Sequence, residues 1–376
     1  MRACCLLFLA WPRLLAASQN ETELQAIESA RHLLQERPDS ESNTFLLASL
    51  YLKVGRNQDA IQLLQGYLQS KPMTAKALRL LATAYLRKED YAAAKDTAEK
   101  ALKAGTRDST AVELLAMSEL GVQESDAAER HFLEALKLNS KSIEANYQLG
   151  LLYTKQHKDL PAAVRLLQTA RSIQPNLAGI DTALGAALLG VGKVSQAVDA
   201  LEIATKTAAN EPESYYLLAT AYRRLNQPEK ADAALASFNA LKKADADRRA
   251  REMRGKADYE EGVNLLSNSN QLDQAYTAFS KALDELPDFD PAYYRMAQVS
   301  YLKGDLPQAL TSIRHAIKLN PFEPEYYFVL ARCLQDNDSK AALEAIDNAI
   351  NLRPGVQDFE DLSRELKSKL TAKPPA

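Results

Sequence analysis

The chain has 376 residues, a formal net charge of -3 at pH 7, 46% hydrophobic residues and 25% charged residues. These values are typical of a globular protein and exclude a disordered one, and the near-neutral charge gives no reason to expect a nucleic acid partner. Glycine is scarce, with 13 residues, and no sustained alternation of β-branched residues occurs. Strong helix formers such as alanine and leucine dominate instead, so we predict an all-α protein.

Residues 1–18 have the layout of a secretory signal peptide. Arg2 precedes an apolar run from Ala3 to Trp11, and the small residues Ala16–Ser18 follow. The run is too short to span a membrane as a helix, which takes about 20 apolar residues. We therefore expect cleavage and a periplasmic or secreted chain without membrane insertion. The alternative is a cytoplasmic chain, or one anchored in the membrane by residues 3–17.

A repeat with a period near 34 residues follows. Each unit has a small residue after an apolar one in a helix-like run, and a second small residue about 12 positions later. The first set is Ala48, Ala82, Ala116, Gly150, Gly185, Ala219, Gly262, Ala297 and Ala331, and the second is Ala60, Ala94, Ala128, Ala163, Ala197, Ala231, Ala275, Ala309 and Ala342. Only alanine or glycine lets two helix backbones approach closely, so we predict nine helix pairs that cross at these residues.

The period and the residue pattern resemble the tetratricopeptide repeat family. The first-helix signature appears as Thr44…Leu47-Ala48…Tyr51 and Tyr215…Leu218-Ala219…Tyr222, and the second-helix signature as Ala309…Ile313…Ala316…Pro321. The resemblance covers about residues 41–355 and departs from the pattern at Glu119, where tyrosine is usual. It implies a right-handed superhelical solenoid of antiparallel helix pairs with a concave groove. Such arrays are stable only as stacks.

One step of the repeat is longer than the others. Ala219 and Gly262 are 43 positions apart, which predicts an extended second helix or two helices joined near Gly255. The basic segment Lys242–Lys256 in this stretch is interpreted as a solvated helix face, with an acidic partner or a membrane surface as the alternative. The predicted organisation is a signal peptide (1–18), an N-terminal capping helix (19–40), six repeats with an extended last helix (41–254), three repeats (255–355), a C-terminal capping helix (356–371) and a disordered tail (372–376).

The sequence holds no catalytic motif that we recognise. The four histidines fall in different repeats without metal-ligand spacing: His32, His131, His157 and His315. Signal-peptide cleavage would leave Cys333 as the one cysteine, so no internal disulfide could form, and its expected role is that of a small buried residue. We predict no enzyme activity, no cofactor and no metal.

The family resemblance implies that first-helix side chains three positions before the small crossing residue face the groove. These positions hold Phe45, Arg79, Glu113, Tyr147, Thr182, Tyr216, Tyr294 and Phe328, of which five are aromatic. Aromatic side chains are favoured anchors for partners, although they can also pack on neighbouring repeats. The predicted partner-binding site comprises Phe45, Arg79, Tyr147, Tyr216, Arg223, Arg224, Tyr294, Phe328 and Arg332.

The predicted function is that of a non-catalytic scaffold or assembly factor that binds an extended peptide or a partner helix in the groove. No Lys–Asn pair stands at the two groove positions that the family uses to clamp chaperone C-termini, which argues against a chaperone tail as the ligand. Two alternatives stay open. One is a polysaccharide-associated solenoid whose aromatic side chains stack on sugar rings, and the other is a regulatory subunit of a larger enzyme complex.

Overall fold

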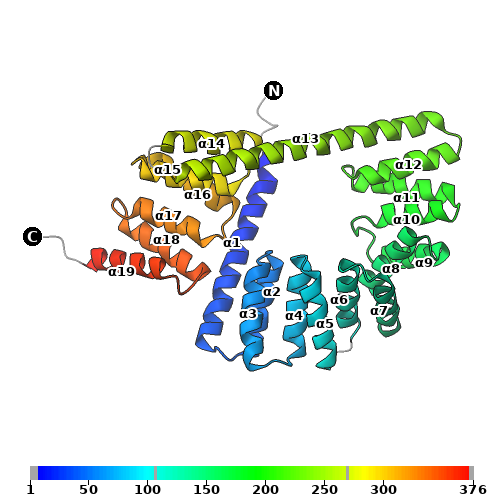
Figure 1. The fold of residues 1–376 in the computed structure, drawn as a ribbon, viewed down its shortest axis with the longest axis horizontal. Coiled ribbons are helices and arrows are strands. Elements are labelled where there is room, and N and C mark those ends of the chain that lie inside the picture. Colours follow the sequence, from blue (N-terminus) through cyan, green and yellow to red (C-terminus); the bar gives the residue numbers. More distant parts are fainter. Residues whose placement is uncertain (1–6, 106–107, 268–270, 372–376) are drawn as a thin grey trace, which may run out of the picture. The chain divides into compact units, whose positions relative to one another are not determined.

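The computed structural model describes residues 7–105, 108–267 and 271–371, with side chains described from residue 22 onward. The first six residues of the predicted signal peptide and the predicted tail at 372–376 lie outside the described residues. The described residues form 19 helices and no strand (Figure 1). The all-α prediction is therefore confirmed.

The chain divides into two compact units, Leu33–Asp245 and Met1–His32 with Ala246–Ala376. Helices α2 to α12 belong to the first unit: α2 (Glu41–Lys53), α3 (Asn57–Ser70), α4 (Ala75–Arg87), α5 (Tyr91–Lys103), α6 (Ser109–Gly121), α7 (Ser125–Leu138), α8 (Ile143–Gln156), α9 (Leu160–Ile173), α10 (Ile180–Gly190), α11 (Val194–Thr207) and α12 (Pro212–Arg224). Helices α14 to α19 belong to the second: α14 (Leu272–Glu285), α15 (Asp290–Leu302), α16 (Leu306–Leu319), α17 (Pro324–Leu334), α18 (Ser339–Leu352) and α19 (Gln357–Thr371).

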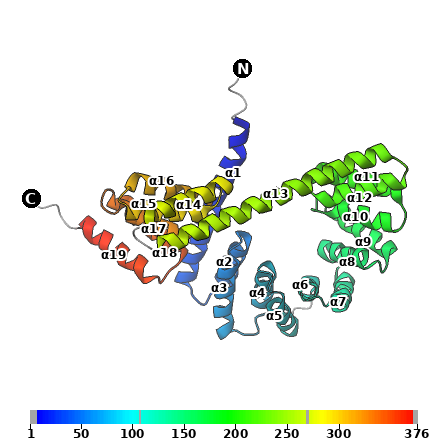
Figure 2. The same ribbon diagram turned by 45° about the horizontal axis from the view of Figure 1, so that its top comes forward.

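Two helices contribute residues to both units: α1 (Leu7–Glu36) and α13 (Pro228–Leu266). Helix α13 is 39 residues long and passes Gly255 without a joint (Figure 1, Figure 2). The first part of α13 forms a helix pair with α12, and its last part forms the next helix pair with α14. The residue boundaries that the sequence analysis gave for the domains stay predictions.

Polar caps and prolines set where many helices begin. The side chains of Asp90, Asp108, Asp159, Asp305 and Asp338 each accept a hydrogen bond from the backbone N–H three residues further on. Such a cap satisfies one of the first N–H groups, which have no partner within the helix. Pro324 stands at the first position of α17, where its missing N–H costs nothing, and α16 ends at Leu319, just before Pro321.

The predicted small crossing residues are all buried, both the first set and the second. At Gly185 a Cβ atom would lie 2.4 Å from Cγ of Leu201, and at Gly262 it would lie 2.6 Å from the Phe279 ring. Leu201 and Phe279 are themselves fully buried. The two helices of a pair therefore approach so closely at these positions that a side chain would collide with the core of the pair.

Residues 22–32 of α1 pack within the second unit. Ile27 and Ala30 are buried, Leu24 lies against the apolar cluster of α17 to α19, and the Arg31 guanidinium donates a hydrogen bond to the Leu352 carbonyl at 2.5 Å. The sequence pattern shows that this stretch has an apolar face, but it does not show which surface that face covers. Leu33 already belongs to the first unit.

No helix in the part of the chain that the structure describes is long and apolar enough to cross a membrane. The backbone of residues 7–18 is helical. Cleavage of the signal peptide and the compartment of the mature chain stay predictions.

Two glycines allow a matched test of the packing: Gly185, which lies at a helix crossing, and Gly66, which does not. Gly185→Ala should lower the free energy of unfolding by about 1–3 kcal/mol, because overpacking a filled core displaces side chains such as Leu201. Gly66→Ala in α3 should instead raise it by about 0.5–1 kcal/mol, because the added methyl meets nothing within 4 Å and alanine favours the helix. Urea denaturation followed by circular dichroism measures both. Equal effects of the two substitutions would contradict close packing at Gly185.

Cys333 reports on the integrity of the second unit. Its side chain is 2% exposed, and burial raises the pKa of its thiol to about 11. In a chain that begins at Gln19 it is the one cysteine. We expect the folded protein at pH 8 to react with a disulfide reagent far more slowly than the urea-unfolded protein does, because the thiolate is both scarce and covered. Equally fast labelling of folded and unfolded chains would show that Cys333 is accessible.

Candidate functional site

The aromatic and charged residues predicted to bind a partner lie on the first helices of successive pairs, in two units. We call the first-unit members of the set the first-unit stripe: Phe45 (α2), Arg79 (α4), Glu113 (α6), Tyr147 (α8), Thr182 (α10) and Tyr216 (α12). Tyr294 (α15), Phe328 and Arg332 (both α17) belong to the second unit. The structure therefore groups the predicted site residues into two sets.

At the start of the stripe the side chains are engaged within the fold. Phe45 is 3% exposed, meets the Tyr67 ring edge to face at 5.4 Å between centroids, and carries the Lys76 ammonium 4.9 Å from its ring centre. The Arg79 guanidinium pairs with the Asp108 carboxylate at 2.7 Å. These contacts leave little of the Phe45 ring for a partner.

Glu113, in the middle of the stripe, is a buried carboxylate. Its exposed fraction is 9%, and burial raises its pKa, while a hydrogen bond with Ser142 acts in the opposite direction. Glu119, where the family usually has tyrosine, is also buried, and its Oε2 lies 2.7 Å from Nδ1 of His131. This contact gives the Glu119 side chain a polar partner inside its own helix pair.

Tyr147 and Tyr216 keep accessible surface at the far end of the stripe. Tyr216 is 52% exposed and packs one side against Phe238, with 5.5 Å between ring centroids. Tyr147 is half-buried, and its hydroxyl lies 3.4 Å from the Ala178 carbonyl, to which it donates. Burial raises the pKa of Tyr147, as do the nearby negative charges, of which Glu211 contributes most. Tyr147 therefore lies in an acidic environment.

The arginines predicted as polar partners differ in their contacts. Arg224 donates a hydrogen bond to the Leu189 carbonyl at 2.7 Å and so covers the end of α10. Arg87 in α4 makes the same kind of contact with the carbonyl of Leu52 in α2. In both places the arginine joins one first helix to the preceding first helix, which is a contact within the fold. Arg223 and Arg332 are exposed.

In the second unit the aromatic rings pack on one another. Tyr294 lies against Tyr326 with 5.0 Å between centroids, and Phe328 lies against Phe359 at 5.2 Å. The sequence analysis missed Tyr259 in α13, which stands three positions before Gly262 and contacts Phe289 at 5.1 Å. The same spacing rule identifies it. Here the rings stabilise the stacking of pairs.

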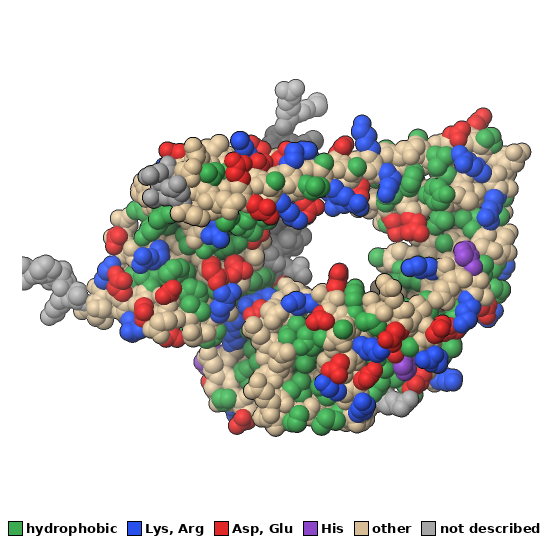
Figure 3. Space-filling view, viewed as in Figure 1, with side chains coloured by type: hydrophobic (Ala, Val, Ile, Leu, Met, Phe, Trp, Pro, Cys, Tyr) green, Lys and Arg blue, Asp and Glu red, His purple; other side chains and the backbone are tan. Residues whose placement is uncertain are grey.

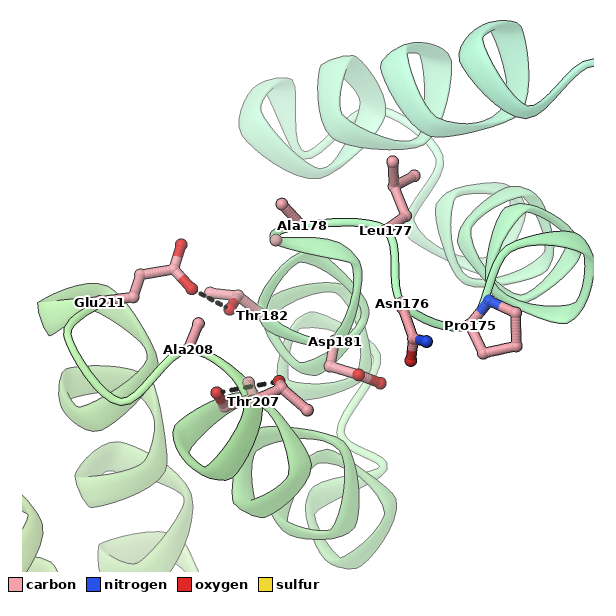
Figure 4. A pocket seen from close by; sticks show the side chains of 11 residues that line it. Pro175, Asn176, Leu177, Ala178, Asp181, Thr182, Thr207, Ala208 and Glu211 are labelled. Carbon is pink, nitrogen blue, oxygen red and sulfur yellow. Dashed lines mark hydrogen bonds between the residues drawn. The ribbon is translucent and has the colours of Figure 1, made fainter. Parts of the chain in front are cut away.

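A cavity of about 350 Å³ lies beside Tyr147 and Thr182 in the first unit (Figure 4). Two turns and two helix ends form it. Its lining comprises Pro175–Gly179 from the α9–α10 turn, Asp181 and Thr182 from the start of α10, Ala204, Thr207 and Ala208 from the end of α11, and Glu211 from the α11–α12 turn. The sequence analysis did not predict this cavity, because it depends on how two turns lie in space.

Two carboxylates line the cavity and differ in their surroundings. Asp181 is buried, and its Oδ1 lies 2.8 Å from Nε of Arg171. Burial raises the pKa of Asp181, and Arg171 opposes this only in part. Glu211 accepts hydrogen bonds at Oε2 from Thr182 Oγ1 at 2.8 Å and from Ser214 Oγ at 3.0 Å. In Figure 4, Glu211 points toward Thr182, and Asp181 points toward the turn that holds Asn176.

Among residues 22–105, 108–267 and 271–371, no group of three or more His, Cys, Asp or Glu side chains could hold a metal ion. On the face shown in Figure 3, acidic and basic side chains are interspersed. The site offers aromatic surface, a cavity and a carboxylate held by hydrogen bonds.

Stacked antiparallel helix pairs, with one small residue at each crossing, define a helical-repeat solenoid protein. Sequence profiles of the tetratricopeptide repeat match residues 45–109, 114–178, 182–249 and 268–333. These matches cover more than half of the chain, which therefore belongs to the tetratricopeptide repeat family. The predicted family and fold class are confirmed.

Some solved structures are similar to part of this chain at low sequence identity. One is described as the crystal structure of YrrB, a TPR protein with an unusual peptide-binding site; it is 21% identical, has a TM-score of 0.41, and the match covers 50% of this chain and 97% of that one. Another is MamA from residue 41 to its end from Desulfovibrio magneticus RS-1, at 19% identity and a TM-score of 0.42, covering 45% and 96%. No curated protein matches the chain.

Asp181 should make stability depend on pH. Because its pKa is raised in the folded chain, the folded state holds the proton more tightly than the unfolded state does. The charged carboxylate therefore lowers stability at neutral pH, and this penalty disappears as the pH falls through the raised pKa. Relative to Asp181→Asn, the wild type should gain stability between about pH 7 and pH 4.

Urea unfolding of both proteins across this range measures the difference. Asp232→Asn, at an exposed position of α13, is the matched control. A wild type that loses stability relative to Asp181→Asn as the pH falls would contradict the raised pKa.

Proposed function

We propose that this chain is a non-catalytic scaffold or assembly factor, and that it binds an extended peptide or a partner helix along the first-unit stripe. The observation that carries the proposal is the half-exposed ring of Tyr216, one repeat away from Thr182, which lines the cavity, and two repeats away from Tyr147. Families of helical repeats bind partners on extended surfaces of this kind.

Of the predicted partner-binding residues in the first unit, Tyr147 and Tyr216 are the aromatic anchors that we propose. Phe45 is covered, and the Arg224 guanidinium already bonds to a backbone carbonyl, so neither has much left to offer a ligand. A tyrosine gives a large apolar area with a polar tip and few rotatable bonds, so it loses little entropy on binding. Exposed Arg223, seven residues after Tyr216 on α12, is the third member of the proposed surface.

We place this activity outside the cytoplasm. The basis is the signal-peptide layout of residues 1–18, with Arg2 before an apolar run and a small-residue site at Ala16–Ser18. Cell fractionation combined with N-terminal sequencing of the natural protein tests it. A mature chain that still begins at Met1 in the cytoplasm would contradict export.

Replacing both anchors should weaken peptide binding strongly without unfolding the chain. Peptides selected from a displayed random library on residues 19–376 serve as ligands, and fluorescence anisotropy gives their Kd. We expect Tyr147→Ala/Tyr216→Ala to weaken binding at least about 30-fold, because loss of a buried anchor costs about 2 kcal/mol or more. Tyr293→Ala, a half-buried tyrosine stacked on His315 in the second unit, is the control and should bind normally.

The result that contradicts the proposal is also specific. It is a selected peptide whose affinity is the same for the double variant and the wild type, or a library from which no peptide is enriched. Circular dichroism of each variant confirms that a loss of binding is not a loss of fold.

A second candidate, a polysaccharide ligand, is favoured by one feature. Sugar binding requires polar partners beside an aromatic ring, and Tyr147 lies near the carboxylates of Glu144, Glu211 and Glu213. A glycan array probed with the same wild type and double variant separates the two. Glycan binding that depends on Tyr147, with no peptide enriched, would favour the polysaccharide.

A further inference from the structure

We propose that the cavity between the α9–α10 turn and the α11–α12 turn receives a lysine or arginine side chain from the bound partner segment. The inference rests on the proposed function and specifies it further, because it makes the ligand of the first-unit stripe a basic peptide. Tyr147 contacts the cavity wall through Ala178, and Thr182 lines it, so a segment that follows the stripe passes the cavity.

The first argument is a buried carboxylate whose charge Arg171 offsets only in part. The Asp181 side chain is 7% exposed and lines the cavity. Arg171 Nε lies 2.8 Å from its Oδ1, yet Oδ1 accepts no well-directed hydrogen bond from any residue that the structure describes. A buried carboxylate whose charge is only partly offset is costly, and a cation in the cavity would stabilise that charge. The raised pKa of Asp181 has the same origin, namely burial that Arg171 does not fully offset.

The second argument is a preorganised carboxylate on the other turn. Thr182 and Ser214 both donate to Oε2 of Glu211, which fixes the carboxylate before any ligand arrives. An ionised carboxylate can accept about four hydrogen bonds over its two oxygens, so Oε1 keeps acceptor capacity for a ligand. Fixed groups bind more tightly than mobile ones, since less entropy is lost on association.

The third argument is the shape and character of the walls. Leu177, Ala178, Ala204 and Ala208 give the cavity an apolar lining beside its two carboxylates. Lysine and arginine combine an apolar stem with a charged head. The stem can be buried on apolar surface while the head is solvated or paired with a carboxylate. A volume of about 350 Å³ lies at the lower end of the range for small-molecule sites, which fits a single long side chain.

Charge decides between cations and other ligands. Asp181 and Glu211 line the cavity, Glu144 and Glu213 lie near Tyr147, and Arg171 is the cation paired with Asp181. An anionic side chain would be repelled by this set, and a neutral apolar one would leave the buried charge of Asp181 only partly offset. Of the two cations, arginine offers the planar fork that can meet a carboxylate with two hydrogen bonds.

A small probe tests the cavity directly. N-acetyl-L-arginine methylamide is titrated into residues 19–376, and its neutral isostere N-acetyl-L-citrulline methylamide is titrated in parallel. Alanine methyl NMR reports on Ala178, Ala204 and Ala208 in the lining. We expect saturable shifts of these methyls with the arginine compound and none with the citrulline compound. Equal responses to both compounds, or no shift at the lining alanines up to the solubility limit, would overturn the proposal.

Charge-removing variants assign the effect to the two carboxylates. Glu211→Gln and Asp181→Asn should each weaken the arginine probe at least about fivefold, while Glu229→Gln, at an exposed position of α13, should not. Using both variants guards against local unfolding in one of them. Unchanged affinity in both folded variants would also overturn the proposal.

The library selection separates this inference from the function on which it rests. Selected peptides that need Tyr147 and Tyr216 but tolerate replacement of every lysine and arginine would retain the proposed function and overturn the cavity assignment. Probe binding at the lining alanines, together with peptides indifferent to both tyrosines, would retain the cavity and overturn the peptide surface.

Discussion

The close crossing of two helices at a small residue is the constraint on which the rest of the structure depends. At Gly185 there is no room for even a methyl group beside Leu201, and the corresponding alanines are equally buried. Each crossing fixes how far apart the helices of a pair lie, and through the following turn it fixes where the next first helix begins. Tyr147, Thr182 and Tyr216 fall at the same offset from their crossing residues, so one packing rule places all three on successive first helices.

Those features that are local in sequence could be predicted from it. The crossing residues, the helix ends near Pro321 and Pro324, and the family follow from a pattern that recurs along the chain. The exposure of each stripe residue could not be predicted, because it depends on neighbours: the same position is covered by Tyr67 and Lys76 at Phe45 but half open at Tyr216. The packing of residues 22–32 in the second unit joins segments more than 300 residues apart, and amphipathic pattern alone does not identify such a partner.

The cavity lies where the repeat pattern is weakest. Helix interiors follow the pattern closely, whereas the turns vary, and the cavity lining comes mainly from the turns around α10. Asp181 and Glu211 stand within one turn of a helix start, where carboxylates are otherwise common caps. Here Arg171 engages one, and Thr182 and Ser214 orient the other. Changes in a few turn residues can thus alter the walls and charges of this cavity while the crossings stay the same.

The predominance of contacts between neighbouring helices has a mechanical consequence for the first unit. In α2 to α12 the packing joins each helix mainly to those directly before and after it, and the one cysteine beyond the predicted signal peptide, Cys333, lies elsewhere. No covalent cross-link therefore spans the array. A pulling force would peel away helix pairs one after another from an end, and the chain would recoil as they re-form. A ligand that spans α8 to α12 would hold these helix pairs together and raise the force needed to separate them.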